Sequence, residues 1–417
     1  MIGEILATGD EIRSGALIDS NSSHIAEQLE AAGVEIRRHQ CVGDSETQIT
    51  LVLQEIGGRS DIAVVTGGLG PTEDDLTALA AAKAAGVRCV LNPTALKEIE
   101  GFFKNRQRLM SDSNKKQAFL PEGSRILSNP IGTAPGFLLT IGRCRFFFLP
   151  GVPAEMKRML KDHVLPEIAG LAAGNRTICI TRTITTFGLT ESATGEQLSD
   201  LNIRFPEIRL GLRAKFPEIQ VKLYAYGKDE AVLTNQLEAS AGWVSQRLGK
   251  RVMSLQGDSM ESVVGRLLKE RSATLGIAES CTGGLISHRM TNIAGSSEYF
   301  LFSCVAYSNQ AKIDLLGVSP DTLKRVGSVH EETAKEMAEG ARKTAGSTFG
   351  LSTTGIAGPG GGTVDKPVGT VCIGLASPRR VIGKRLQFSF GNRGMNKMIF
   401  AQTALDVLRL ELLKDDK

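Results

Sequence analysis

The sequence predicts an α/β fold class, with two three-layer α/β sandwich domains joined by a small α+β domain. Residues 1–172 and 254–417 alternate short apolar runs with amphipathic helical patterns, which is typical of a parallel sheet covered by helices on both faces. Residues 173–253 break this alternation with longer β-rich segments. At 417 residues the chain is long enough for these three domains, each with its own core.

Residues 1–172 alternate strand and helix patterns in order along the chain. Ser45 is placed to cap a helix whose apolar residues recur at i, i+3, i+4 and i+7, namely Ile49, Val52, Leu53 and Ile56. The expected strands are 2–7, 34–41 and 61–66, and further helices are expected around 25–32 and from near Thr72 to Ala85.

The rest of the chain divides into a middle part and a second alternating part. In the middle part, strands are expected at 176–186 and 220–226, with helices at 191–201 and 230–248. In the C-terminal part, strands are expected at 275–278, 300–307, 349–354 and 368–376. Its helices are expected at 260–268, 282–290, 309–316, 331–344 and 395–413.

Composition excludes several classes of protein. The 49 basic and 45 acidic residues give a net charge of +4, which is too balanced for a protein expected to bind nucleic acid or an anionic membrane. No apolar stretch approaches the roughly 20 residues of a membrane span. Seven widely spaced cysteines without C-x-x-C, and five histidines without H-x-H, argue against disulfides and structural zinc. We therefore expect a reduced, cytoplasmic protein with no membrane partner.

The densest motif is the glycine-rich stretch from Thr66 to Thr77, TGGLGPTEDDLT. Its glycines can let successive backbone N–H groups converge on an anion, and the helix expected from near Thr72 would add the positive end of its dipole. The threonine hydroxyls can donate to phosphate oxygens. The residues predicted to hold the phosphate are Gly67, Gly68, Gly70, Thr72 and Thr77.

Two carboxylates, Asp74 and Asp75, follow within this stretch. Carboxylates beside a phosphate pocket imply a bridging divalent metal such as Mg²⁺, so both are candidate catalytic and metal-ligating residues. Taken alone, they fit equally well as acidic residues at a helix N-terminus. No Gly-Lys-Ser/Thr follows, so the stretch is not a Walker A motif.

Other polar loops lie at expected strand ends of the N-terminal domain. In an open parallel sheet such loops converge at the carboxyl ends of the strands, where ligands bind. Singly, each is a plausible turn; as a set they predict one pocket. They are Gly9–Glu11, Asn21, Gly43–Asp44, 129–136 and 150–155.

In the C-terminal domain, Ser280 stands at an expected strand-to-helix turn, which would expose its hydroxyl as a nucleophile. Lys312 is a candidate base, since a lysine desolvated near a serine can lose its proton at neutral pH. From spacing alone, Lys312 fits better as a solvated helix lysine. Cys281 is a rival nucleophile, but its side chain should point away from that of Ser280. His288 and His330 lie in ordinary patterns and are not expected to act as bases.

Two further segments complete this predicted pocket. The glycine-rich loop 355–362 follows an expected strand and allows the backbone to approach a ligand closely. Arg393 precedes the last expected helix, where it can hold a phosphate with both guanidinium nitrogens, although it also fits as a surface arginine.

The N-terminal domain resembles that of the competence/damage-inducible protein A (CinA) family in six motifs: GDEIRSG, VGDSE, TGGLGPTEDDLT, NKKQA, NPIGTAPGF and LPGVPAEM. The resemblance implies a molybdopterin-binding-like domain acting as a pyrophosphatase on ADP-ribose. It also implies dependence on Mg²⁺ or another divalent metal, with K⁺ assisting in some members. By the same analogy the middle domain is KH-like; it lacks a G-x-x-G loop, so RNA binding is not expected.

The C-terminal domain, from about Glu261 onward, resembles the family's nicotinamide-nucleotide amidase domain in AESCTGG, IAGSSEYF, AYSNQAK, GIAGPGGG with KPVGTV, and GNR. This implies hydrolysis of nicotinamide mononucleotide to nicotinate mononucleotide and ammonia, without a cofactor. It assigns Ser280 as nucleophile, with Tyr307 and Lys312 assisting. Where this chain has Asn392, the family more often has aspartate. The implied substrate-binding residues are Thr282, Gly283, Ser296, Ser297, Asn309, Gly355, Ile356, Gly358 and Arg393.

The sequence therefore predicts a bifunctional enzyme of pyridine-nucleotide salvage, a homodimer whose partners are small-molecule nucleotides. Two alternatives stay open. The first domain has the loop a molybdopterin adenylyltransferase would use, and the family's name suggests a non-enzymatic adaptor in competence or DNA repair. The balanced charge argues against direct DNA binding in the second case.

Overall fold

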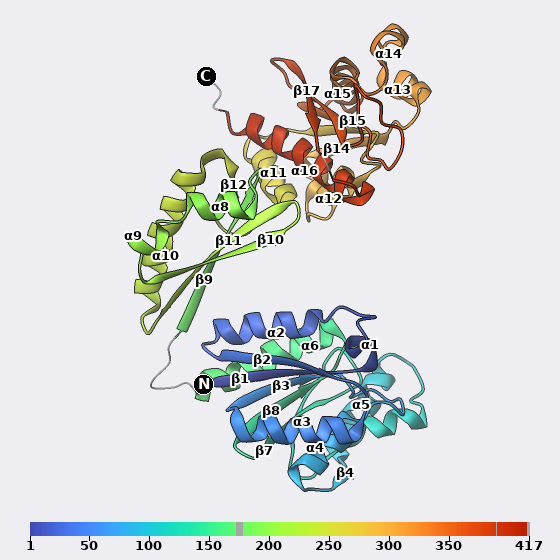
Figure 1. Ribbon diagram of the computed structural model, residues 1–417. Coiled ribbons are helices and arrows are strands. Elements are labelled where there is room, and N and C mark those ends of the chain that lie inside the picture. The colour runs from blue at the N-terminus through green and yellow to red at the C-terminus, as the bar shows by residue number, and fades with distance from the viewer. Residues whose placement is uncertain (172–177, 389, 415–417) are drawn as a thin grey trace. The chain divides into compact units, whose positions relative to one another are not determined.

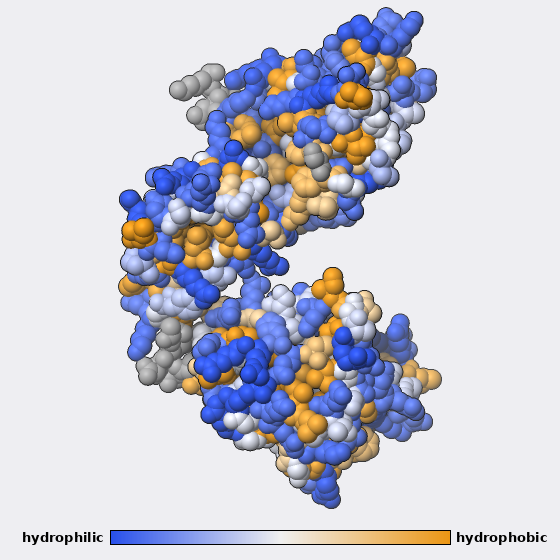
Figure 2. Space-filling view, viewed as in Figure 1, coloured by the Kyte–Doolittle hydropathy of each residue, from blue (hydrophilic) through white to orange (hydrophobic). Residues whose placement is uncertain are grey.

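The computed structural model describes residues 1–171, 178–388 and 390–414, which form two compact units. One unit comprises Met1–Thr181 with Ala225–Asn235, and the other comprises Arg182–Tyr224 with Gln236–Lys417. Helices flank the large sheets of both units (Figure 1). Hydrophilic side chains predominate on the face drawn in Figure 2. No helix in the described residues is long and apolar enough to cross a membrane.

The first unit is built on a six-stranded sheet with the order β2-β1-β3-β8-β7-β6. The four strands β2, β1, β3 and β8 are parallel, whereas β7 runs antiparallel to both of its neighbours. The strands are β1 (Ile2–Thr8), β2 (Glu35–Val42), β3 (Ile62–Thr66), β6 (Arg125–Leu127), β7 (Gly136–Ile141) and β8 (Cys144–Leu149). A separate two-stranded sheet pairs β4 (Cys89–Leu91) with β5 (Phe119–Pro121).

Helices cover both faces of this sheet, which confirms the three-layer sandwich (Figure 1). One core lies under α3 (Glu46–Arg59), α4 (Thr77–Ala85) and α5 (Pro93–Asn105), and the other under α2 (Ser20–Ala31) and α6 (Pro153–Met159). The side chain of Ser45 caps α3 as expected by accepting from the Gln48 amide, and Ile49, Leu53 and Ile56 are buried. The remaining elements are α1 (Asp10–Arg13), η1 (Asp112–Ala118), η2 (Leu160–Val164) and α7 (Leu165–Leu171).

The middle part has a four-stranded sheet with the order β10-β11-β9-β12. Its strands and helices confirm the expected α+β class. The expected strand from Arg176 begins outside the described residues, and its described part is β9. The strands are β9 (Ile178–Phe187), β10 (Ile208–Lys215), β11 (Glu218–Gly227) and β12 (Val252–Ser254). The helices are α8 (Glu191–Gln197), α9 (Leu201–Arg204), α10 (Glu230–Leu248) and η3 (Gly249–Arg251).

The C-terminal part has a five-stranded sheet with the order β14-β13-β15-β16-β17. Strands β14, β13 and β15 are parallel, and β16 and β17 extend the sheet antiparallel. The strands are β13 (Leu275–Glu279), β14 (Phe300–Val305), β15 (Phe349–Gly355), β16 (Thr370–Ala376) and β17 (Val381–Gln387).

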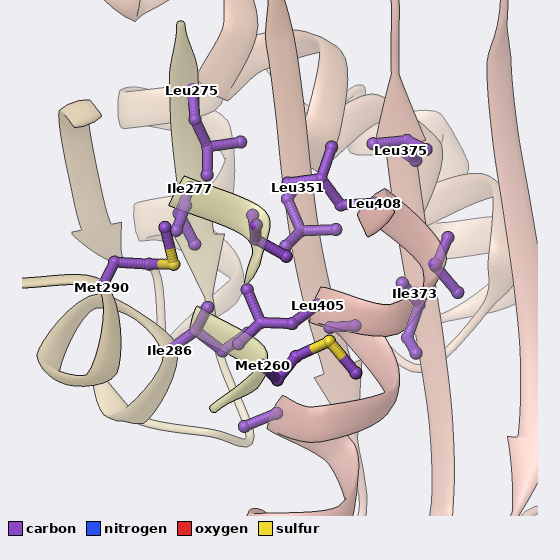
Figure 3. Close-up of a cluster of buried hydrophobic side chains, with 14 of the residues drawn as sticks. Met260, Leu275, Ile277, Ile286, Met290, Leu351, Ile373, Leu375, Leu405 and Leu408 are labelled. Carbon is purple, nitrogen blue, oxygen red and sulfur yellow. The ribbon is translucent and has the colours of Figure 1, made fainter. Parts of the chain in front are cut away.

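Two helical layers cover this sheet, so it too is a three-layer sandwich. The larger core is shown in Figure 3, where Leu405 and Leu408 of α16 lie over Leu351 and Ile373 of the sheet. This face carries α11 (Met260–Glu270), α12 (Leu285–Thr291) and α16 (Arg393–Leu412). The other face carries α13 (Asn309–Leu316), α14 (Pro320–Val326) and α15 (Glu331–Ala345), and η4 (Ser296–Glu298) precedes β14.

Two helices begin later than expected. Helix α4 begins at Thr77 rather than near Thr72, because the Asp75 carboxylate accepts from the amide and hydroxyl of Thr72 and closes a turn there. Helix α12 begins at Leu285 rather than Thr282, because Gly283 and Gly284 have φ values of 60° and 89°, in the left-handed region. The predicted nucleophile Ser280 and the predicted phosphate residue Thr72 therefore lie in turns rather than in helices.

The domain boundary expected between residues 253 and 254 falls in a segment that packs against the C-terminal core. Met253 is 6% exposed and belongs to the C-terminal core. The buried Arg409 guanidinium donates to the carbonyls of Lys250 at 2.6 Å and Val252 at 3.2 Å. A fragment that begins at Ser254 would remove both carbonyl acceptors and leave the buried guanidinium with the Asp406 carboxylate alone, so any isolated C-terminal half should retain residues from Gly249 onward.

Candidate functional sites

A cavity of about 460 Å³ lies at the carboxyl ends of β1, β3 and β8 in the first unit. The loops singled out in the sequence do converge on it, as expected for ligand-binding loops of a parallel sheet. Its lining includes Gly9, Glu11, Asn21, Asp44, Gly67, Gly68, Gly70, Thr72, Asp74, Asp75, Thr133, Gly151 and Glu155.

The three glycines of the loop are required by its own packing. Gly67 and Gly68 have φ values of 110° and 63°. A side chain on Gly67 would collide with the carbonyl of Thr8, and one on Gly68 with the hydroxyl of Thr77. A Cβ on Gly70 would lie 2.5 Å from the carboxylate of Asp75. The loop thus folds tightly against its own polar groups at the cavity wall.

The polar residues of the loop have different roles. Asp75 Oδ2 accepts from the Thr72 amide at 2.9 Å and from its hydroxyl at 2.5 Å, while Asp74 is exposed at the cavity. Thr77, which the sequence predicts as a phosphate ligand, is fully buried, and its hydroxyl pairs with that of Thr8 at 3.0 Å. Thr77 therefore supports the loop from behind rather than facing the cavity.

Further carboxylates line this cavity. Burial raises the pKa of Asp44, and repulsion from Asp10, Glu11 and Asp74 raises it further. The described chain holds no group of three or more His, Cys, Asp or Glu side chains arranged to bind a metal ion. The donor set nevertheless fits Mg²⁺, which usually takes one or two protein carboxylates and completes its shell with water and substrate phosphate oxygens. Asp74 and Asp75 are the residues that could hold such an ion.

Asn21 is a cavity residue whose role the sequence did not resolve. Its amide nitrogen donates to the Gly151 carbonyl at 2.7 Å and to the Thr66 hydroxyl at 3.2 Å, which links the ends of β3 and β8. Its buried Oδ1 has no hydrogen-bond partner in the structure. An unsatisfied buried acceptor in a cavity wall is suited to accept from a ligand hydroxyl.

A smaller cavity of about 270 Å³ adjoins the first and shares Gly68, Gly70 and Asp75 with it. Its wall is mainly apolar, and Lys116, whose ammonium donates to the Thr72 carbonyl, lies among its lining residues. An apolar slot beside a polar cavity suits a ligand with one planar ring and one phosphorylated part. The slot's apolar residues are Leu69, Ala78, Leu79, Phe119, Leu120 and Pro135.

The second site begins at the turn after β13. Ser280 is 8% exposed, and its amide donates to the Thr353 carbonyl at 2.9 Å. Lys312 on α13 is 1% exposed, and its ammonium nitrogen lies 3.3 Å from Ser280 Oγ. It also donates to the carbonyls of Ala306 at 2.8 Å and Tyr307 at 3.3 Å. The structure therefore brings the expected serine and lysine together.

Burial sets the chemistry of both Lys312 and the rival Cys281. Burial lowers the pKa of Lys312, and Cys281 opposes this effect. The lowered pKa makes the neutral, proton-accepting form of the Lys312 amine more populated at a given pH. Cys281 is 5% exposed and belongs to the apolar core, where burial raises its thiol pKa to about 12. The thiol is thus protonated at neutral pH, whereas Ser280 faces the lysine.

Glu279 is an organising residue that the sequence analysis missed. Its buried carboxylate accepts from the amides of Gly284 at 3.0 Å, Ile286 at 3.1 Å and Ser287 at 2.9 Å, and from the Ser287 hydroxyl at 2.6 Å. It therefore occupies N–H groups at the start of α12, which leaves these groups unable to face a substrate. Its position directly before Ser280 indicated that it lies near the site, but not that it caps α12.

We predict that Glu279→Gln lowers the free energy of unfolding by about 1–3 kcal/mol, because buried donors lose a charged acceptor. Urea unfolding with an unchanged denaturant slope would measure this. Glu298→Gln, which alters an exposed carboxylate paired with Lys269, is the control and should change stability little. Equal stability of the Glu279→Gln variant and the parent would contradict the capping role.

Tyr307 and Arg393 contact each other beside the loop through Gly358. The Tyr307 side chain is 64% exposed, and its hydroxyl accepts from Arg393 at 3.3 Å. Arg393 also donates to the Gly358 carbonyl at 2.6 Å. It is the backbone of Tyr307, not its phenol, that contacts Lys312. The expected direct assistance from the Tyr307 side chain is therefore not seen in this geometry.

Lys397, one turn after Arg393 on α16, is a second cation that the sequence analysis missed. A Cβ on Gly283 would lie 3.5 Å from its ammonium nitrogen. Residues four apart share one helix face, so both cations border the Ser280 turn and the loop through Gly358. Such a pair suits a phosphate group. Asn392 instead caps α16 by accepting from the Met395 amide at 3.1 Å, which explains an asparagine there.

The other residues assigned by resemblance fall into three positions. Gly355 ends β15, Ile356 and Gly358 follow it, and Asn309 is exposed at the start of α13. Thr282 is buried, and its hydroxyl pairs with Thr353 at 2.7 Å.

Ser296 and Ser297 lie far from Ser280 within this unit. They precede β14, whose first residue pairs with Leu275, whereas Ser280 follows the other end of β13. The strand separates them by about 3.3 Å per residue. The two serines therefore cannot join Ser280 in one pocket of the same chain, because α12 returns the chain to the opposite edge.

The histidines have structural roles. His330 accepts from the Glu332 amide at 3.1 Å and caps α15. His288 is exposed on α12 and contacts Asn292. As expected, neither His288 nor His330 lies beside Ser280.

Comparison with known proteins gives matches over the whole chain. Family models match for a probable molybdopterin binding domain over 4–170, a damage-inducible protein CinA KH domain over 181–253 and a CinA C-terminal domain over 257–412. A CinA-like protein from Desulfosudis oleivorans is 51% identical over 99% of this chain and 100% of its own length. Another from Desulforapulum autotrophicum is 49% identical over 98% of each chain.

Among solved structures, the competence/damage inducible protein CihA from Agrobacterium tumefaciens is 37% identical. The match covers 39% of this chain and all of that one, with a TM-score of 0.36.

Proposed function

Because this chain belongs to the CinA-like protein family, we propose that it is a nucleotide-processing hydrolase with two active sites. The C-terminal site would hydrolyse nicotinamide mononucleotide to nicotinate mononucleotide and ammonia. The N-terminal site would hydrolyse ADP-ribose to AMP and ribose 5-phosphate. The expected homodimer and cytoplasmic location are retained as part of this proposal.

The amidase proposal is carried by one observation, the buried Lys312 nitrogen 3.3 Å from Ser280 Oγ. In this proposal the neutral Lys312 amine takes the hydroxyl proton as Ser280 Oγ bonds to the carboxamide carbon. The proton is then given to the departing nitrogen, which leaves as ammonia, and water attacks the resulting ester to release nicotinate mononucleotide. Backbone N–H groups of the turn, rather than of the first turn of α12, would stabilise the oxyanion, since Glu279 occupies the latter.

Binding of the mononucleotide would use the cations at the start of α16. Arg393 and Lys397 border the Ser280 turn and suit the single phosphate of this substrate. The exposed ring of Tyr307, held by Arg393, would lie against the nucleotide rather than relay protons. The experiment that tests the proposal is incubation with nicotinamide mononucleotide and identification of the products.

The pyrophosphatase proposal is supported by the cavity with its glycine loop and carboxylates. Asp74 and Asp75 would hold Mg²⁺ or another divalent metal, which when bound would supply charge stabilisation to the pyrophosphate. The glycine loop would orient the phosphates, with Thr72 holding Asp75 in place through its amide and hydroxyl. Asn21 Oδ1 would accept from a ribose hydroxyl, and the adjoining apolar slot would take the adenine. A K⁺ requirement stays a proposal drawn from the family resemblance.

We predict a pH dependence for the amidase that follows Lys312. Only the neutral amine can accept the serine proton, and burial lowers its pKa from the ordinary value of 10.5. Turnover of nicotinamide mononucleotide should therefore rise with pH to a plateau, with a midpoint below that value. A rate profile from acid to alkaline pH measures it, and Lys312→Met should lose this rising limb. A rate that falls over the same interval would contradict the role of Lys312 as base.

A further inference from the structure

The apolar slot beside the glycine loop contains a lysine that the proposed function leaves without a role. Lys116 lines the slot together with Gly68, Gly70 and Asp75, and these last three residues also line the larger cavity. The two cavities therefore meet at the glycine loop, and Lys116 lies on the slot side of it. Within the described residues 1–171, no other Lys or Arg lines the slot.

The larger cavity has many carboxylates on its wall, and no Lys or Arg of the described chain is among its lining residues. The acidic lining residues are Glu11, Asp19, Asp44, Asp74, Asp75 and Glu155. A pyrophosphate bound there therefore depends on a metal ion, or on a cation outside that lining, for positive charge. Lys116 is the cation that the structure places in the adjoining wall.

The ammonium of Lys116 is held at the turn that Asp75 closes. It donates to the carbonyl of Thr72, the residue whose amide and hydroxyl donate to Asp75. It also lies near Asp74, because the pKa of that carboxyl is lowered mainly by the Thr72 hydroxyl and to a smaller extent by the charge of Lys116. An ammonium has three N–H donors, and within the described chain one of them is in use. The other two are left for a ligand.

The segment that carries Lys116, η1, is held against the glycine loop by buried amides. Gln117 is 5% exposed, and its side-chain nitrogen donates to the Leu69 carbonyl at 3.4 Å. Its Oε1 accepts from the side chain of Asn114 at 3.1 Å, and Asn114 in turn accepts from the Ser111 hydroxyl at 2.7 Å. Lys116 therefore reaches the loop from an ordered backbone, which lowers the cost of ordering it around a ligand.

The slot and Lys116 together match the two parts of a nucleoside 5′-phosphate. The slot's apolar wall, which includes Phe119 and Leu120, suits a planar base. In such a nucleotide one sugar separates the phosphate from the base, so a base in the slot places the phosphate at its margin, beside the glycine loop and Lys116. An ammonium on a phosphate is a charge-assisted contact, which is stronger than a neutral hydrogen bond.

The simplest alternative is a structural role, in which Lys116 supports the Thr72 carbonyl and offsets the charge of the neighbouring aspartates. That role accounts for one N–H donor and not for the place of the side chain in the slot wall. The two roles have different consequences. Loss of a support weakens the binding of any ligand in the slot, whereas loss of a phosphate partner weakens the binding of the phosphorylated ligand alone.

We propose that Lys116 binds the phosphate attached to the nucleoside, so that the slot and this lysine form a subsite for a nucleoside 5′-phosphate. The inference rests on the proposed pyrophosphatase site and gives its substrate a direction. Lys116 holds the AMP half of ADP-ribose on the slot side of the glycine loop, and the ribose 5-phosphate half lies in the larger cavity.

The test compares two photoactivated probes on the full chain with Mg²⁺ present: 8-azido-AMP, and 8-azidoadenosine, which lacks the phosphate. Labelled peptides are identified and quantified by mass spectrometry, and the dependence of label on probe concentration gives an apparent Kd for the slot alone. We expect both probes to label segments 78–79 or 119–120, with the lower Kd for 8-azido-AMP. Excess AMP should prevent this labelling.

Substitution of the lysine separates the two roles. Lys116→Met should raise the apparent Kd of 8-azido-AMP at least about tenfold, because a hydrogen bond to a charged group is lost, and should leave that of 8-azidoadenosine unchanged. Lys116→Arg keeps the charge and should retain most of the affinity. The matched control is Lys115→Met, which alters an exposed lysine paired with Asp112 at 2.8 Å outside the slot lining, and it should change neither Kd. Thermal unfolding checks that each variant is folded.

Equal losses for both probes in Lys116→Met would overturn the proposal, since they would show that the lysine only supports the slot. An unchanged Kd of 8-azido-AMP in this variant, or absence of label from segments 78–79 and 119–120 of the parent, would do the same. The readout is binding, so it is independent of hydrolysis. If the parent does not cleave ADP-ribose but shows the phosphate-dependent label, the pyrophosphatase proposal fails and the subsite stands.

Discussion

Ser280→Ala should reduce turnover of nicotinamide mononucleotide at least about 10²-fold, and Lys312→Met should do the same. The first change removes the only atom placed to attack the carboxamide in the proposed mechanism. The second removes the amine 3.3 Å from that atom while keeping most of the side-chain volume of a residue that is 1% exposed. Steady-state assays of released ammonia measure both.

The double variant tests whether Ser280 and Lys312 act together in one step or contribute independently to turnover. Because Ser280 and Lys312 act on the same proton, the double variant should be little worse than either single one. Cys281→Ala is the control, since its thiol lies in the core with a pKa of about 12. If Cys281→Ala loses turnover while Ser280→Ala keeps it, the nucleophile is the cysteine and the proposal for Ser280 fails.

Asp74→Ala and Asp75→Asn should each abolish cleavage of ADP-ribose and leave the amidase unchanged. The proposed metal would be held by these carboxylates beside the pyrophosphate, and removal of either charge lowers its affinity. Asp75→Asn keeps an oxygen that can accept from Thr72, so the loop retains its turn. Release of AMP, followed by chromatography, measures the reaction.

The metal itself is tested by chelation. EDTA should stop ADP-ribose cleavage, and added Mg²⁺ should restore it in the parent but not in Asp74→Ala. Glu73→Gln, which changes the neighbouring exposed carboxylate outside the cavity lining, is the matched control and should keep the activity. Full-rate cleavage in EDTA would show that the reaction does not use a divalent metal.

Periodicity in the sequence was sufficient to predict both sandwiches. Of the predicted i, i+3, i+4, i+7 pattern, Ile49, Leu53 and Ile56 lie in a core and Val52 packs against it partly buried, and α10 and α13 have the bounds expected. No bounds were predicted for strands β4 to β8, β10, β12 and β17, or for helices α1, α5, α6, α7 and α14. Most residues of β10 and β17 are not fully buried, so their sequences lack the continuous apolar run that marks a central strand.

The candidate sites were predictable where they depend on chain topology, and not where they depend on side-chain direction. The loops at strand ends converge on one cavity because parallel strands end at one edge. Thr77 and Thr282, in contrast, lie in the right segments but are buried beneath them. Ser296 and Ser297 belong to a matching motif, yet the chain passes through α12 before reaching them, so they lie at the opposite edge.

Glu279 and Lys397 show what spacing cannot reveal. Nothing in the order of residues says that a carboxylate before the serine will turn back to cap α12, or that a lysine more than a hundred residues later will border Gly283. These contacts are set by the packing of α12 and α16 on the same face of the sheet.

The measurement that tests the central claim most directly is product identification after incubation of the purified full chain with nicotinamide mononucleotide alone. The account predicts equal amounts of nicotinate mononucleotide and ammonia, formed by the parent protein and by Cys281→Ala but not by Ser280→Ala. Unchanged substrate, or release of free nicotinamide in place of ammonia, would contradict it.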